Sequence, residues 1–77
     1  GIHVFMNNAS GELQIKNTTN EEITSIALYN YLGQTLKTWN SNFNIRTISL
    51  PISIPTGVYL VHINTKTGKI VKKISVE

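Results

Sequence analysis

The C-terminal part of the chain decides the fold: Val58-Tyr59-Leu60-Val61-His62-Ile63-Asn64, then Lys66-Thr67-Gly68, then Lys69-Ile70-Val71-Lys72-Lys73-Ile74-Ser75-Val76. The first segment is the most apolar in the chain and is rich in β-branched and aromatic residues, which favour strands. The short connection that follows contains glycine. We therefore predict a terminal β-hairpin over 58–76 with a loop of three or four residues.

The same kind of segment recurs upstream. Gly11–Lys16 alternates, with Leu13 and Ile15 on one face and polar residues on the other, as a half-buried strand does. Turn residues occur about every eight to twelve positions, a spacing typical of a β-sandwich or a small barrel. We expect seven strands, at Ile2–Phe5, Gly11–Lys16, Ile23–Asn30, Gln34–Trp39, Ile45–Leu50, Val58–Asn64 and Lys69–Val76.

The connections carry their own signals. Asn30–Gln34 reads as a tight turn in which Gly33 supplies a positive φ, and Asn40–Asn44 reads as a loop. Pro51–Gly57 contains two prolines, which lack the N–H donor, so this segment should run along a sheet edge.

Composition supports one small all-β domain over residues 1–77. The 77 residues are 40% hydrophobic and include 11 Ile, 5 Val and 9 Thr, so one residue in three is β-branched. A second core could not be filled from so short a chain. Cysteine is absent, so no disulfide or thiolate site supplements the core.

The residues needed for catalysis or metal binding are scarce. Asp and Cys are absent, Glu21 and Glu22 are neighbours that point to opposite faces of an extended chain, and His3 and His62 are far apart in sequence. A triad written from Ser49, His62 and Glu22 lacks a nucleophile elbow. We therefore predict that the domain is not an enzyme and uses no cofactor or metal.

Charge and aromatic residues leave two binding hypotheses open. The net charge is +3, and four of the seven basic residues fall in the terminal hairpin, which would suit nucleic acid. Lysine on an edge strand is also the ordinary protection against edge-to-edge aggregation, and we favour that reading, with no nucleic-acid partner. Exposed Tyr29, Tyr31 and Trp39 would suit a carbohydrate-binding module. The longest apolar runs are four residues, so no membrane span is predicted.

The basic residues of the terminal hairpin are Lys66, Lys69, Lys72 and Lys73.

Three blocks in order resemble the type A C-terminal sorting domain of the type IX secretion system of Bacteroidetes. In Phe5-Met6-Asn7-Asn8-Ala9-Ser10-Gly11 the aromatic residue, Asn7 and Gly11 match the first block, while Met6 and Asn8 stand where that family has prolines. Ile26-Ala27-Leu28-Tyr29-Asn30-Tyr31-Leu32-Gly33-Gln34-Thr35-Leu36 matches the second block, with its Gly33-Gln34 step. The third block appears as Ile48-Ser49-Leu50, Pro55-Thr56-Gly57-Val58-Tyr59-Leu60-Val61, Thr67-Gly68-Lys69 and Lys72-Lys73-Ile74-Ser75-Val76.

This resemblance implies a seven-strand antiparallel β-sandwich of the Greek-key, immunoglobulin-like type. It also implies a domain cut from a larger secreted precursor, which directs an N-terminal cargo in cis across the outer membrane. The implied partners are the type IX translocon and a surface sortase that removes the domain. The implied location is the periplasm in transit, then the cell surface or the medium. The alternative is a surface module with the same architecture that binds carbohydrate or protein.

For a sorting domain, we expect recognition at an exposed sheet edge and the terminal hairpin. Removal of Ile74–Glu77 should then abolish export even if circular dichroism shows that the remaining sheet is intact. The turn motif is assigned to Asn7, Gly11, Gly33, Gln34 and Gly68. The expected docking strip consists of Gly57, Tyr59, Lys69, Lys72, Lys73, Ile74, Val76 and Glu77.

Overall fold

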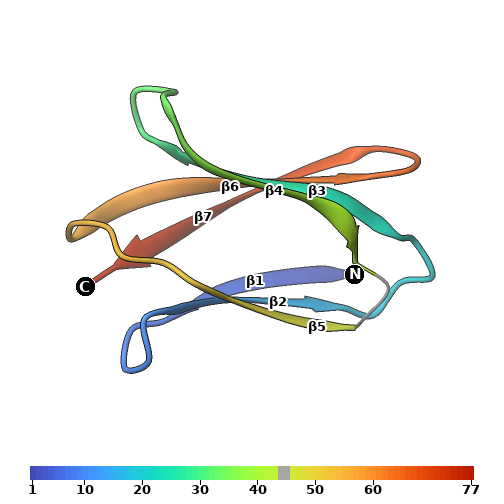
Figure 1. Ribbon diagram of the computed structural model, residues 1–77, viewed down its shortest axis with the longest axis horizontal. Helices are drawn as coiled ribbons and strands as arrows, with labels where there is room; N and C mark the ends of the chain where they lie inside the picture. The colour runs from blue at the N-terminus through green and yellow to red at the C-terminus, as the bar shows by residue number, and fades with distance from the viewer. Residues whose placement is uncertain (44–45) are drawn as a thin grey trace.

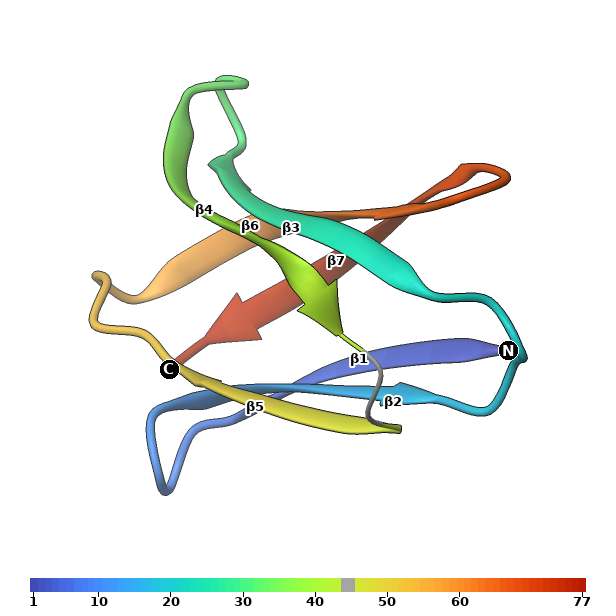
Figure 2. The same ribbon diagram turned by 45° about the vertical axis from the view of Figure 1, so that its right-hand side comes forward.

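The computed structural model describes residues 1–43 and 46–77, and within them the chain forms seven strands in two antiparallel sheets (Figures 1 and 2). One sheet has the order β1-β2-β5 and the other the order β4-β3-β6-β7. This confirms the all-β, seven-strand antiparallel sandwich. The strands are β1 (Ile2–Asn7), β2 (Glu12–Asn17), β3 (Ile23–Asn30), β4 (Thr35–Phe43), β5 (Thr47–Pro51), β6 (Gly57–Thr65) and β7 (Lys69–Val76).

The chain crosses between the sheets at β2–β3, β4–β5 and β5–β6, while β3–β4 and β6–β7 are hairpins within one sheet. This is the connectivity of an immunoglobulin-like sandwich whose fourth strand pairs with the third rather than with the fifth. The terminal hairpin has the predicted three-residue loop, Lys66–Gly68.

The core lies between the two sheets and is built from the alternating residues that face inward. Leu13 and Ile15 of β2 are fully buried, as the alternation predicted, and Ile26 and Leu28 face them from β3. The other buried apolar residues are Ile2, Ile23, Ile48, Leu50, Ile52, Tyr59, Val61, Ile63, Ile74 and Val76.

The strand bounds differ from expectation at β4. This strand continues past Trp39 to Phe43, so the predicted loop at 40–44 is wrong for its first four residues. Asn40 pairs with Ser25 and Phe43 with Ile23, on either side of a register shift that places one extra residue in β4. Pairing with a central strand therefore overrides the weak strand preference of asparagine. The rest of that loop and the expected start of the fifth strand, residues 44 and 45, lie outside the described residues.

Two turns position the ends of the strands. Gly33 has φ of +84° in the β3–β4 turn, as predicted, and Gly11 has φ of +72° where β1 turns into β2. Residues that carry a Cβ rarely adopt positive φ angles of this size. Pro51 ends β5, an edge strand, and Ile52 N then donates to Gly11 O at 3.0 Å, so the start of the proline-containing segment runs along the sheet edge as expected, whereas Pro55 lies in the connection to β6.

Candidate docking surface

The terminal strand β7 presents two different faces. Its register with β6 sets Tyr59 opposite Ile74 and Gly57 opposite Val76 on the core side. Ile74 and Val76 are only 4% and 7% exposed, so these side chains belong to the core and offer almost no surface to a partner in the folded domain. Within the predicted docking strip, these two residues can therefore contribute their main-chain groups but not their side chains.

The lysines of β7 remain in solvent. Lys69 and Lys73 lie on the outer face, whereas Lys72 lies opposite Val61 on the core-facing side and is nevertheless exposed, because β7 is an edge strand. The only ion pair among the described residues joins Lys66 to Glu22 at 3.0 Å. The three lysines of β7 therefore form an exposed positive strip along one sheet edge.

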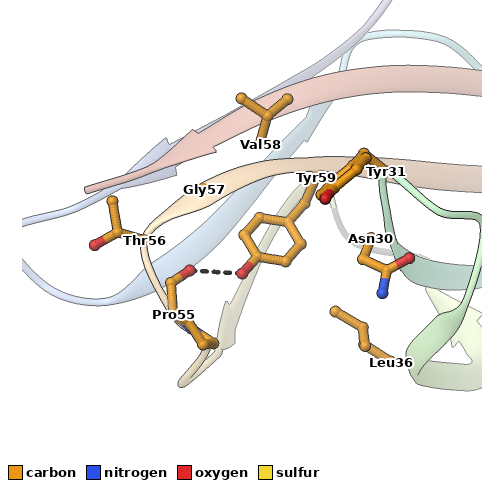
Figure 3. Close-up of a pocket in the computed structure, with 8 residues that line it drawn as sticks. All are labelled: Asn30, Tyr31, Leu36, Pro55, Thr56, Gly57, Val58 and Tyr59. Carbon is orange, nitrogen blue, oxygen red and sulfur yellow. Dashed lines mark hydrogen bonds between the residues drawn. The ribbon is translucent and has the colours of Figure 1, made fainter.

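Tyr59 holds the connection that precedes β6. Its hydroxyl donates to Pro55 O at 2.6 Å, and its ring is 8% exposed (Figure 3). This is the tyrosine corner of immunoglobulin-like sandwiches, in which a tyrosine early in the sixth strand fixes the corner before it. A Cβ on Gly57 would lie 3.5 Å from the Tyr59 ring. Both residues thus shape the corner.

A cleft of about 310 Å³ opens beside this corner, between the β3–β4 turn and the start of β6 (Figure 3). Tyr31 and Leu36 are 78% and 44% exposed at its rim. Val58 is also exposed, but its side chain points away from the Tyr59 ring (Figure 3). The lining residues are Asn30, Tyr31, Leu36, Pro55, Thr56, Gly57, Val58 and Tyr59.

The side chain of Asn8 ties the first turn to the last strand. Its Nδ2 donates to Ser75 O at 3.3 Å, and its Oδ1 accepts from Glu77 N at 2.9 Å. These bonds span the edge of β7 at its C-terminal end. Glu77, although exposed as a side chain, is therefore anchored through its main chain.

The two ends of the sandwich carry different parts of the chain, and we call them the N-terminal and C-terminal poles. The N-terminal pole holds Gly1, whose amine donates to Thr18 Oγ1 at 2.7 Å, together with the β6–β7 turn. The C-terminal pole holds Asn8, Glu77 and the cleft (Figures 1 and 3). The chain thus enters the domain at one end and leaves it at the other.

Residues 3–77, nearly the whole chain, match the family model described as Secretion system C-terminal sorting domain. The chain belongs to this family. The sorting domain is accordingly a C-terminal signal for type IX secretion, whose cargo is joined to it in cis. A comparison with curated proteins gave no match.

The motif residues of the sorting domain lie in turns. Asn7 Oδ1 accepts from Ala9 N at 3.1 Å, and Gln34 Oε1 accepts from Asn30 Nδ2 at 2.7 Å. Gly68 N donates to Thr65 Oγ1 at 3.1 Å in the terminal turn. With Gly11 and Gly33, these residues define the turns.

The two histidines lie in different sheets of the sorting domain, His3 on β1 and His62 on β6. The ring of His62 packs at a tilt of 42° against the ring of Tyr29, with 4.2 Å between ring centroids, and its buried Nδ1 has no hydrogen-bond partner. Burial, and secondarily the charge of Lys69, lower the pKa of His62 below its ordinary 6.5. Residues 1–43 and 46–77 hold no group of three or more His, Asp or Glu that could bind a metal. No helix long and apolar enough to cross a membrane occurs in that part of the chain.

The aromatic residues of the sugar-binding alternative do not form one platform. Trp39 is half-buried against the core, with Lys37 Nζ 5.4 Å from its ring centroid. Tyr29 lies on the outer face of the same sheet against His62, and Tyr31 lies in the turn. The family match supports the sorting function and not this alternative.

Sequence reasoning missed Asn8 and the cleft. The bonds of Asn8 join residues 67 and 69 positions apart, and no local pattern reports such a contact. The cleft had a weak signal: Tyr31, one of its lining residues, places a large aromatic side chain in a turn, where small and polar residues are usual.

Proposed function

We propose that the sorting domain travels through the periplasm with its cargo, docks on the type IX translocon through its C-terminal pole and the β7 edge, and is then cut off by a surface sortase. The cargo is left at the cell surface or in the medium. The domain itself performs no catalysis, a reading supported by the lack of Asp and Cys and by the separation of the two histidines.

The observation that carries this proposal is the placement of the two poles. Cargo attached before β1 lies beyond the N-terminal pole, while the β7 lysines extend from the terminal turn toward the cleft and Glu77. A folded cargo therefore leaves the C-terminal pole accessible. The connection before β1 is equally accessible to a protease, because Gly1 is exposed.

The test is the mass of an exported reporter. A reporter with a Sec signal and this chain at its C-terminus is expressed in a host that has the type IX system. We expect the reporter in the medium or on the surface to lack the 77 residues, and the same reporter in a host without the sortase to keep them. An exported reporter that keeps the domain in both hosts would show that the sortase step is wrong.

A further inference from the structure

We propose that the open edge of β7 recognises an acidic extended segment, which adds to the four-stranded sheet as a further antiparallel strand. This inference deepens the proposed docking function and rests on it. It is carried by three observations: the direction of the main-chain groups of β7, the lysines on both sides of them, and the side chain of Asn8 at one end.

The main-chain groups of alternate β7 residues point away from β6. In an antiparallel ladder a residue bonds one neighbouring strand with both its N–H and its C=O, and the next residue points to the other side. Ser75 O and Glu77 N both bond Asn8, so these residues face away from β6. Thr65 N donates to Gly68 O at 2.8 Å, so the even-numbered residues face β6. Lys69, Val71 and Lys73 therefore direct their N–H and C=O groups to the open edge.

Nothing within the described part of the chain pairs with those three residues from the open side. β7 approaches β1 near its C-terminal end, where Asn8 lies, and diverges from β1 toward the terminal turn (Figures 1 and 2). The edge is thus closed at Ser75 and Glu77 and open from Lys69 to Lys73. Asn8 sets the limit of the strand that can be added.

Charge decides what kind of strand fits. Lys69 and Lys73 flank the edge on the outer face and Lys72 flanks it on the inner face, and no ion pair joins them to an acid among the described residues. Opposite charges directly across a ladder are stabilising and like charges are destabilising. An incoming strand with acidic residues at the three positions opposite these lysines would place an opposite charge across from each of them.

A second copy of the domain fits this edge poorly. Antiparallel pairing of two β7 strands centred on Val71 sets Lys69 opposite Lys73 twice. Pairing centred on Lys72 or Lys73 sets that lysine opposite its own copy. The same lysines that favour an acidic partner therefore oppose self-association through this edge.

The probe is a capped peptide of sequence TIEEVTE, in which antiparallel pairing sets Ile opposite Ile74 and the three glutamates opposite Lys73, Lys72 and Lys69. The control peptide is TIQQVTQ. Binding to the 77-residue chain is followed by amide NMR shifts at low salt. We expect saturable shifts centred on the Val71 and Lys73 amides. Three opposite-charge pairs change affinity about threefold to hundredfold, so TIQQVTQ should bind at least about threefold more weakly.

Matched variants separate this site from general charge. K69Q/K72Q/K73Q should weaken TIEEVTE binding to the level of TIQQVTQ, whereas K16Q/K37Q/K66Q, with the same net charge, should bind as the unmodified chain does. In Asn8→Ala the shifts should extend to the Ser75 amide, opposite the first threonine of the peptide, and Asn20→Ala, an exposed asparagine on another loop, should not extend them.

Three results would each overturn the inference. They are equal binding of both peptides, amide shifts centred on β4 or on the cleft, and no shifts with TIEEVTE at millimolar concentration. The proposed function fails separately. If the unmodified chain exports a reporter but does not bind the acidic peptide, sorting stands and the acidic-strand inference falls. If the chain does not export, the docking function falls whatever the peptide does.

Discussion

The hydroxyl of Tyr59 donates a 2.6 Å hydrogen bond to Pro55 O, four residues upstream, and thereby fixes the corner that forms one wall of the cleft. The acceptor is a main-chain carbonyl in the proline-containing connection between the sheets. Removal of the hydroxyl leaves that carbonyl without its partner next to a ring that is 8% exposed.

Tyr59→Phe should therefore lower the free energy of unfolding by about 1 kcal/mol. For a domain of this size, 1 kcal/mol corresponds to a fall of about 4–8 °C in Tm, which thermal denaturation followed by circular dichroism measures. Tyr31→Phe is the control, because Tyr31 is 78% exposed and should keep the original Tm. Equal Tm values for Tyr59→Phe and the unmodified domain would show that the corner bond is not stabilising.

Two glycines in turns should respond differently to alanine. Gly33 has φ of +84°, which a Cβ makes unfavourable, whereas Gly68 has ordinary φ and open space around it. Gly33→Ala should lower the free energy of unfolding by about 1–2 kcal/mol, and Gly68→Ala should change it by less than about 0.5 kcal/mol. Urea denaturation of the two variants checks this, and a Gly68→Ala cost as large as that of Gly33→Ala would contradict it.

His62 should make the domain less stable in mild acid. Its pKa is lowered on folding by burial and by Lys69, so the unfolded chain binds the proton more readily than the folded domain does. Stability from this residue is complete above pH 6.5 and declines as the pH falls through the lowered pKa of the folded domain. Urea midpoints measured from pH 7.5 to about 5, above the usual range of glutamate titration, should fall with pH.

His62→Gln should flatten that slope, and His3→Gln, a change at an exposed residue of the other sheet, should leave it in place. If the urea midpoint of His62→Gln falls with pH as steeply as that of the unmodified domain, the pH dependence comes from other groups.

Deletion of Ile74–Glu77 should unfold the domain, so loss of export by this variant would not by itself locate the docking strip. The deletion removes two core side chains that are 4% and 7% exposed, and truncation of such residues costs about 2–5 kcal/mol each. A domain this small has roughly that much stability in total. We expect no cooperative thermal transition from the truncated chain, while Glu77→Gln melts normally. A normal cooperative transition in the truncated chain would contradict this prediction. The deletion would then test docking without a change in folding.

Most of the fold could be predicted because its signals are local. Three local patterns each predicted one element, and the structure agrees with all three. They are the alternation around Leu13 and Ile15 for β2, Gly33 for the β3–β4 turn, and the apolar segment before the terminal turn for β6. The extension of β4 could not be predicted, because Asn40 is held in a strand by its pairing with Ser25 rather than by its own preference.

The docking surface was only partly predictable. The lysines of β7 are visible in the sequence, but alternation alone does not show that Ile74 and Val76 face the core while Lys72, on the same side, reaches solvent at the edge. The closure of that edge by Asn8 depends on the β1–β2 turn meeting the end of β7 at one pole. Such contacts follow from topology and not from neighbouring residues.

Export of a reporter tests the central claim most directly. A reporter with a Sec signal and this chain at its C-terminus is compared with K69Q/K72Q/K73Q and K16Q/K37Q/K66Q fusions in a host that has the type IX system, and the reporter is measured in the medium, on the surface and in the periplasm. The predicted result is export by the unmodified chain and by K16Q/K37Q/K66Q, with periplasmic retention of K69Q/K72Q/K73Q although it folds normally. Retention of the unmodified fusion in the periplasm, while an established family member exports the same reporter, would contradict the sorting function.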